Sequence, residues 1–154
     1  MVWLSETREV EASAEGLMQV MTFVEEYCEQ SGQSKKITRR LLMICDELVS
    51  NIRKYAYPDG KGLIRVSLHP ALSDGKSDET SGPEKDKSIM IKFVDQGIPF
   101  NPLLAEEADT TLPLSERPIG KLGITIVRDY AQSIEYKWEN DNNILTIVLK
   151  MDAL

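Results

Sequence analysis

The sequence predicts a two-layer α/β sandwich, in which a mixed, largely antiparallel sheet is covered on one face by three helices. Two long stretches in the N-terminal half repeat apolar residues at helical spacing, whereas later segments alternate apolar and polar residues as strands do. The strand-like segments follow one another in pairs, which favours antiparallel neighbours. With 154 residues, the chain is expected to form a single domain over 1–154.

The first half of the chain is expected to contain one strand and two helices. Residues 2–10 form the strand, with three apolar side chains facing inward: Val2, Leu4 and Val10. A helix then runs from the N-cap Ser13 to Ser31. A second helix begins near Ser34 and ends at the turn signal 57–60, Tyr-Pro-Asp-Gly. Its apolar stripe consists of Ile37, Leu41, Ile44, Leu48 and Ile52.

The second half is expected to form two pairs of strands separated by a lid and a helix. Alternation predicts strands over 64–68, 89–94, 134–138 and 145–149, and a third helix over 122–130. The polar segment 73–87 is interpreted as a mobile hairpin loop. Segment 99–121 lacks periodicity and carries four prolines, which is typical of a lid or binding loop. A turn is expected at Asp141, Asn142 and Asn143.

Composition excludes several classes of function. The formal net charge of −7 argues against nucleic acid as the main partner, because phosphate backbones require clustered Lys and Arg. No apolar run approaches the ~20 residues of a membrane span, and the N-terminus lacks the features of a signal peptide, so we expect a cytoplasmic protein without a membrane partner. Cys28 and Cys45 fall in helical patterns and are interpreted as reduced core thiols. One histidine and no Cys-x-x-Cys pattern argue against a zinc site.

Glu47 and Asn51 are candidate catalytic and metal-binding residues. They are four residues apart, so they share one face of the second helix, at the edge of its apolar stripe. Magnesium prefers oxygen ligands and keeps several waters, so one carboxamide oxygen and phosphate oxygens are a sufficient site. Glu47 could accept a proton from an attacking hydroxyl. The spacing alone is more typical of two solvated residues on a surface helix.

Asp95 and Gly97 follow an apolar strand and are candidates for binding a purine base. A carboxylate at the end of such a strand is disfavoured unless it has hydrogen-bond partners. Gly97 permits a close backbone approach or a positive φ. A simple turn at the exit of the strand is the alternative reading of the same residues.

A third group of candidates lies near the start of the third helix. Gly120 and Gly123 flank Lys121 and Leu122, and the N-terminus of a helix attracts phosphate. Lys121 and Arg117 supply cations that could pair with a polyanion. A loop glycine followed by an ordinary helix start is the alternative.

Taken together, these motifs resemble those of a known ATPase superfamily, which includes gyrase, heat-shock chaperones, histidine kinases and mismatch-repair ATPases. Within it the chain is most similar to the anti-sigma-factor serine/threonine kinases. The resemblance covers almost the whole chain, and implies the histidine-kinase-like ATPase (Bergerat) fold. It is carried by the N box at 47–57, a first glycine box at 95–102, a second glycine box at 118–128 and a terminal strand at 143–150.

The resemblance implies a role for each candidate residue. Asn51 would bind the Mg²⁺ that bridges the ATP phosphates, and Asp95 would accept a hydrogen bond from the adenine amino group. Gly97 would let the backbone approach the base. Glu47 would be the base that prepares the acceptor hydroxyl. The remaining nucleotide-binding positions lie at the second glycine box and just before it: Arg117, Gly120, Lys121, Leu122 and Gly123.

Three positions depart from the pattern of the family. Tyr55 stands where many relatives have His, Lys121 where many have a second Gly, and Ile119 near the place of a basic residue.

Three functions are compatible with the sequence. The first is a Mg-ATP-dependent serine/threonine kinase of the anti-sigma-factor type. The resemblance implies that it would phosphorylate a small antagonist protein, bind a sigma factor and form a homodimer. The second is a nucleotide-responsive binding module without kinase activity. The third is the catalytic domain of a split histidine kinase, which needs a phosphoacceptor histidine, whereas His69 lies at the end of a predicted strand.

Overall fold

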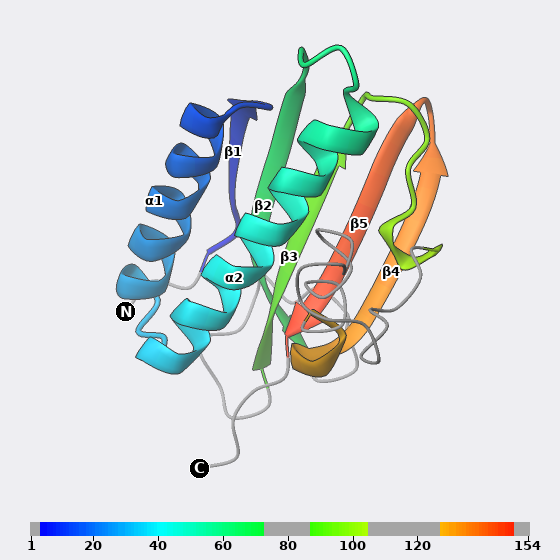
Figure 1. Ribbon diagram of the computed structural model, residues 1–154. Coiled ribbons are helices and arrows are strands. Elements are labelled where there is room, and N and C mark those ends of the chain that lie inside the picture. The colour runs from blue at the N-terminus through cyan, green and yellow to red at the C-terminus, as the bar shows by residue number, and fades with distance from the viewer. Residues whose placement is uncertain (1–3, 73–86, 105–126, 150–154) are drawn as a thin grey trace, which may run out of the picture.

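The computed structural model describes residues 4–72, 87–104 and 127–149. Within them, helices lie against one face of a five-stranded sheet (Figure 1). The sheet order is β1-β2-β3-β5-β4, and every neighbouring pair is antiparallel. The predicted two-layer architecture is therefore confirmed. In chain order the elements are β1 (Glu6–Glu11), α1 (Ala14–Gln30), α2 (Lys35–Asn51), a π-helical turn (Ile52–Ala56), β2 (Leu63–Leu72), β3 (Lys87–Asp95), a 3₁₀ turn (Pro102–Leu104), β4 (Ala131–Glu139) and β5 (Asn142–Leu149).

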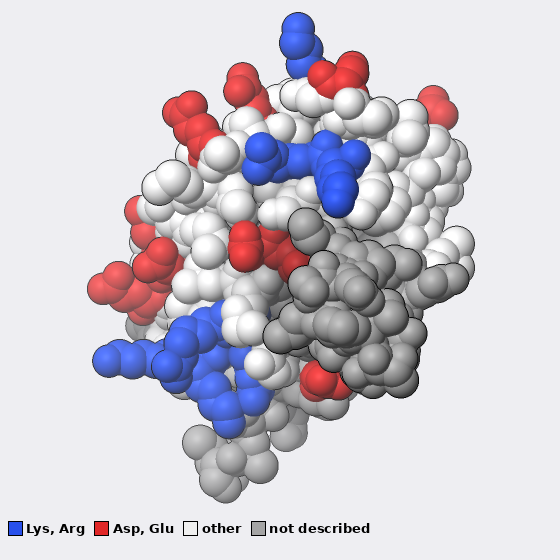
Figure 2. Space-filling view, in the orientation of Figure 1, with Lys and Arg blue, Asp and Glu red and all other residues white. Residues whose placement is uncertain are grey.

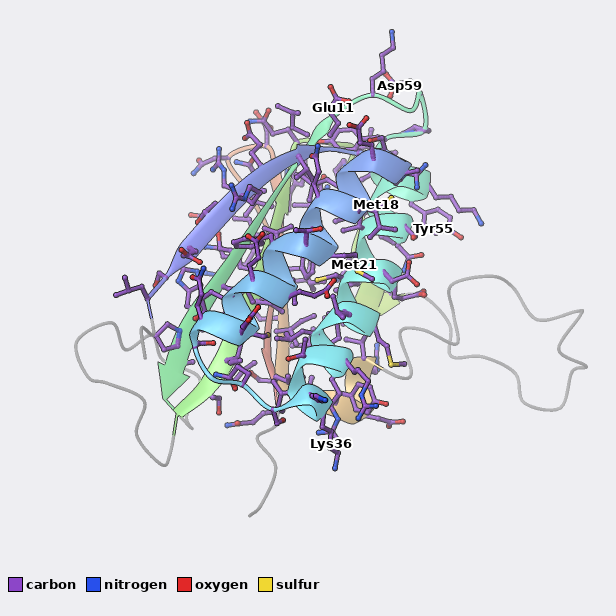
Figure 3. All side chains as sticks on the ribbon, turned by 90° about the vertical axis from the view of Figure 1, so that its left-hand side faces the viewer. Glu11, Met18, Met21, Lys36, Tyr55 and Asp59 are labelled. Atoms are coloured by element: carbon purple, nitrogen blue, oxygen red, sulfur yellow. The ribbon has the colours of Figure 1, made fainter. Side chains whose placement is uncertain are left out.

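Both long helices begin at the serines that the sequence indicates. The Ser13 hydroxyl accepts a hydrogen bond from the Gly16 amide at 3.0 Å, and the Ser34 hydroxyl accepts one from the Ile37 amide at 3.1 Å. These bonds satisfy backbone donors that the first turn of a helix leaves unpaired. Figure 3 shows α1 and α2 side by side on the same face of the sheet. None of the described helices is both long and apolar enough to cross a membrane.

The core lies between this helical layer and the sheet. Alternate side chains of the central strands face the helices, as the period of two requires, and meet the apolar stripes of α1 and α2. The largest fully buried side chains of this interface include Val20, Val24, Leu41, Ile44, Leu48, Ile64, Leu68, Ile89, Ile91, Phe93, Ile147 and Leu149. Burial raises the pKa of the Cys28 and Cys45 thiols, which are free and neutral core groups.

Helix α1 lies very close to the first strand, and Gly16 permits this approach. A Cβ at position 16 would lie 1.8 Å from the backbone oxygen of Glu11, a distance that no side chain can occupy. The glycine in the first turn of α1 therefore sets how closely the helix packs on the edge of the sheet.

Two predictions about element ends are wrong. Strand β1 begins at Glu6, and Leu4 is 58% exposed, so Val10 is the one predicted inward residue that the described strand buries. The last hairpin turns at Asn140 and Asp141, both with positive φ, which is typical of a two-residue turn. Asn142 and Asn143, predicted as turn residues, belong to β5.

Several predicted segments lie largely outside the described residues. They include most of the 73–87 loop, most of the 99–121 lid and the first part of the third helix, of which residues 127–130 are described and helical.

Candidate functional site

Glu47 and Asn51 lie in the last turns of α2 and contact each other directly. The Asn51 carboxamide nitrogen donates a hydrogen bond to Glu47 Oε1 at 3.3 Å, and the Asn51 side chain is buried, at 6% exposure. The Asn51 nitrogen bonds to Glu47, and among the described residues no hydrogen bond to the carboxamide oxygen is present. The pair therefore supplies one oxygen donor suited to a hard cation.

Glu47 is half-buried, and this environment raises the pKa of its carboxyl. Burial is the main cause, the hydrogen bond from Asn51 opposes it, and the nearby charge of Asp46 adds to it. A carboxylate with a raised pKa binds a proton more readily than an ordinary surface glutamate. Glu47 is therefore well suited to accept one from a neighbouring hydroxyl.

Asp95 is the last residue of β3 and is buried, at 3% exposure. Its Oδ1 accepts hydrogen bonds from the Gly97 amide at 2.9 Å and from the Asn143 carboxamide nitrogen at 2.8 Å. Burial raises the pKa of the Asp95 carboxyl, while these two hydrogen bonds oppose the rise. The second oxygen has no hydrogen bond to the described residues, so it remains able to accept one from a ligand.

Asn143 holds Asp95 in place, and the sequence does not identify it as a site residue. It lies opposite Asp95 in the pairing of β3 with β5 and is 4% exposed. Besides its bond to Asp95, its nitrogen donates to the Ile98 carbonyl at 2.9 Å. Its oxygen accepts from the Phe100 amide at 2.8 Å and from the Tyr136 hydroxyl at 2.5 Å. This carboxamide is fully hydrogen-bonded, so it fixes the orientation of Asp95.

A pocket lies between the end of α2 and the sheet. Leu48 and Ile52 of the helical layer form one wall, and Asp95 and Asn143 supply the polar groups. Its other lining residues are Phe93, Phe100, Pro102, Tyr136 and Leu145. The cavity measures about 10 Å³, room for about one water, so a purine ring would enter only after the lining side chains moved apart. Its lining, apolar with two convergent polar groups, is of the kind that binds a flat ring carrying a hydrogen-bond donor.

Gly97 lies where the chain leaving β3 passes the end of the helical layer. A Cβ at this position would lie 2.3 Å from the Ala56 backbone oxygen, and the next amide, that of Ile98, donates to the same oxygen at 2.9 Å. The close approach that requires a glycine is therefore to the π-helical turn. The sequence predicts a close approach here, and the approach of this backbone to a base stays a prediction.

Tyr55, which departs from the pattern of the family, lies beside the start of the predicted lid. Its ring centroid is 5.1 Å from that of Phe100. The Nζ atom of Lys54 also lies over the Tyr55 ring, 5.1 Å from its centroid. Figure 3 shows Tyr55 at the end of the helical layer, pointing outward. The aromatic pair links the end of the N box to the residues that follow the first glycine box.

Charge is unevenly distributed along α2. Figure 2 shows Lys and Arg side chains gathered where α2 begins and again near its far end, with acidic side chains between them. The sequence places Arg53 and Lys54 in the turn that follows Asn51. A chain of net charge −7 thus presents cations close to the Glu47–Asn51 pair.

The predicted residues of the second glycine box lie outside the described residues. They are Arg117, Gly120, Lys121, Leu122 and Gly123. Within the described part of the chain, no group of three or more His, Cys, Asp or Glu side chains is arranged to hold a metal ion.

Two other features of the described residues are separate from this pocket. His69 lies within β2, with its Nδ1 2.9 Å from the Ser5 hydroxyl, so it is not on a helix as a phosphoacceptor histidine would be. A surface groove of about 640 Å³ runs between Arg8 of β1 and the α1 residues Met18 and Phe23. None of the predicted site residues that the structure describes lines that groove.

Comparison with known proteins agrees with the fold. A search of curated proteins finds no match. Residues 10–149 match the family model of the histidine kinase-like ATPase domain. The match runs from the end of β1 to the end of β5 and includes both the Glu47–Asn51 pair and Asp95. The chain therefore belongs to the histidine kinase-like ATPase domain family.

Proposed function

We propose that this protein is a Mg-ATP-dependent serine/threonine protein kinase of the anti-sigma-factor type. The observation that carries the proposal is the buried Asp95 carboxylate, held by Gly97 and Asn143 at the base of a pocket whose wall is the helix bearing Glu47 and Asn51. Family membership supports the use of ATP, and the finer assignment to protein kinases rests on the motifs of the sequence.

Asp95 and Asn143 would select adenine. One oxygen of Asp95 is occupied by two donors, so the other is oriented to accept a hydrogen bond from an exocyclic amino group. Adenine carries such a group at its six position, whereas hypoxanthine carries a carbonyl there. Leu48 and Ile52 provide the apolar surface against which the ring would pack.

Asn51 would hold the metal, and its environment fits that role. Its nitrogen is held by Glu47, which leaves a carboxamide oxygen, the ligand type that Mg²⁺ prefers. Bound Mg²⁺ would supply charge neutralisation at the ATP phosphates. The remaining ligands would be phosphate oxygens and water.

Glu47 would accept the proton from the acceptor hydroxyl. In the transfer, a new bond forms between the hydroxyl oxygen of a serine or threonine and the γ-phosphorus, and the bond from that phosphorus to the β,γ-bridging oxygen of ATP breaks. The proton passes to Glu47, and ADP leaves with the electron pair of the broken bond. The raised pKa of Glu47 supports this role.

The test is phosphoryl transfer to the antagonist protein, with Glu47→Gln as the matched variant. We expect the wild type to place phosphate on a serine or threonine of the antagonist. Glu47→Gln should bind Mg-ATP with unchanged affinity but transfer about 10²–10⁴ times more slowly. Binding of ATP by the wild type without any transfer would contradict the kinase assignment and favour a nucleotide-responsive binding module.

The partners are part of the same proposal. The sequence resemblance supports an antagonist protein as the phosphoryl acceptor, a sigma factor as a second binding partner and a homodimer as the assembly. Among the described strands, β1 lies at one edge of the sheet and pairs with β2 alone, and an edge strand is a place where a second chain can pair. Light scattering over a range of concentrations tests the homodimer, and a monomer at every concentration would contradict it.

A further inference from the structure

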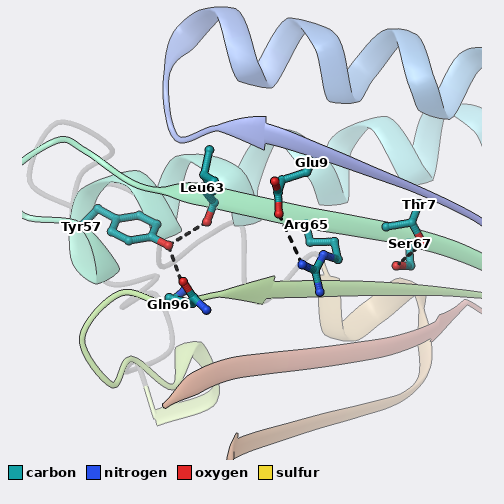
Figure 4. Close-up of polar contacts among 7 residues, drawn as sticks. All are labelled: Thr7, Glu9, Tyr57, Leu63, Arg65, Ser67 and Gln96. Atoms are coloured by element: carbon teal, nitrogen blue, oxygen red, sulfur yellow. Dashed lines mark hydrogen bonds and ion pairs between the residues drawn. The ribbon is translucent and has the colours of Figure 1, made fainter. Parts of the chain in front are cut away.

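Tyr57 ends the helical layer with a hydroxyl that bridges two strands. The hydroxyl donates to the Leu63 carbonyl at 2.7 Å and accepts from the Gln96 amide at 2.8 Å, as Figure 4 shows. The residue is 7% exposed. Its hydroxyl therefore uses both its donor and its acceptor capacity on the backbone at the start of β2 and just beyond β3.

A second contact joins the end of the helical layer to the residues that follow β3. The Ala56 carbonyl accepts a hydrogen bond from the Ile98 amide at 2.9 Å. We call these three hydrogen bonds, those of the Tyr57 hydroxyl and that between Ala56 and Ile98, the staple.

Two glycines make room for the staple. A Cβ at Gly62 would lie 2.1 Å from the Tyr57 ring, and a Cβ at Gly97 would lie 2.3 Å from the Ala56 oxygen. Neither position has a positive φ, so each glycine is explained by the missing side chain and not by its backbone conformation.

The staple connects the two halves of the candidate site. On one side, α2 continues without interruption from Asn51 through the π-helical turn to Tyr57. On the other side, the pairing of β2 with β3 ends at Asp95, and Gln96 comes next, where no sheet partner is available for its amide. The Tyr57 hydroxyl supplies that partner, so it fixes the first residue after the base-reading carboxylate.

The π-helical turn has no part in the sheet, and such turns inside helices are frequent at functional sites. Tyr57 follows this turn as its C-cap residue, with its ring where a Cβ at Gly62 would lie and its hydroxyl bonded to the Gln96 amide. The chain that continues from the helix bearing Asn51 thus contacts the residue that follows Asp95.

We propose that Tyr57 is a positioning residue for nucleotide binding, whose hydroxyl fixes the base-reading Asp95 relative to the helix that carries Asn51. This inference rests on the proposed function, because it assumes that the two residues contact opposite ends of one nucleotide. It makes Tyr57 a determinant of adenine selectivity although it does not line the pocket.

The experiment compares Mg-ATP with Mg-ITP, in which a carbonyl replaces the amino group that Asp95 would read. Tyr57→Phe removes the hydroxyl and keeps the ring against Gly62. We expect it to weaken Mg-ATP binding by about fivefold, the equivalent of one hydrogen bond, and to leave Mg-ITP binding nearly unchanged. The dissociation constant for Mg-ITP divided by that for Mg-ATP, both measured by calorimetry, should therefore fall by about fivefold.

A matched control separates positioning from stability. Ser31→Ala removes a buried hydrogen bond of 2.7 Å to the Tyr27 carbonyl at the far end of α1. Ser31→Ala should lower the free energy of unfolding about as much as Tyr57→Phe does. It should leave the ratio of the Mg-ITP to the Mg-ATP dissociation constant unchanged. Hydrogen exchange in the nucleotide-free protein should show a faster Gln96 amide in Tyr57→Phe and an unchanged one in Ser31→Ala.

A second variant disturbs the staple at a residue that does not line the pocket. Gly62→Ala crowds the Tyr57 ring, so it should lower the same ratio of dissociation constants. Equal losses of affinity for both nucleotides, or an unchanged ratio in Tyr57→Phe, would overturn the inference and leave ATP binding intact. A wild type that does not bind Mg-ATP would instead overturn the proposed function, and the inference with it.

Discussion

Asp95 is a residue whose environment opposes its own charge. Burial raises the pKa of its carboxyl despite the hydrogen bonds from Gly97 and Asn143, so the protein holds a carboxylate that is less favourable than one in water. Functional sites commonly retain groups of this kind. The proposed recognition of a base would explain why the chain keeps a carboxylate at this position.

Asp95→Asn tests this explanation. The amide oxygen can keep both hydrogen bonds while the charge is removed, so we expect the free energy of unfolding at pH 7 to stay the same or to rise. ATP binding should be lost, because the carboxylate acceptor is gone. Urea unfolding and calorimetry measure the two quantities, and a strong loss of stability would show that the carboxylate is structural.

Asn51→Ala tests the metal site. Without the carboxamide oxygen, Mg²⁺ should no longer increase the stabilisation by ATP. For the wild type at a hundredfold excess of Mg-ATP over its Kd, that stabilisation is ~2.7 kcal/mol. The measurement is thermal unfolding with and without Mg²⁺, and an unchanged shift in the variant would remove Asn51 from the site.

The elements of the fold follow from local patterns, whereas the contacts between them do not. Ser13 and Ser34 mark the helix starts because a cap acts within a few residues. Asn143 could not be found in this way. Its partner Asp95 is 48 residues away in the sequence, and their contact depends on the register of β3 with β5. A local pattern contains no information about that register, and it also gave no sign of the π-helical turn.

The packing of α1 on β1 provides a prediction for an element. Gly16→Ala would place a Cβ 1.8 Å from the Glu11 oxygen, so the helix must shift. We expect a loss of about 1–3 kcal/mol in the free energy of unfolding, as for other overpacked sites. Met18→Ala, at an exposed position of the same helix, should change it by less than about 0.5 kcal/mol. Similar effects in both variants would contradict this account of the glycine.

For the whole molecule, the raised pKa values of Asp95 and Glu47 predict how stability depends on pH. A native pKa above the unfolded value means that the folded state binds protons first, so its stability rises as the pH falls through the raised pKa values. We expect urea unfolding of the nucleotide-free protein to show this rise below pH 7. The double variant Asp95→Asn, Glu47→Gln should show a smaller rise, and an identical pH profile would contradict the assignment.

The pairing of Asp95 with Asn143 has a consequence for the newly made chain. A ribosome adds ~5–20 residues per second, so the 48 residues between them take roughly 2–10 s to synthesise. Throughout that interval the emerging polypeptide contains α2, with the proposed metal ligand Asn51, but lacks β5, whose Asn143 donates to Asp95. Nucleotide capture should therefore begin only when translation has delivered β5, so that ATP stabilises finished molecules and not nascent ones.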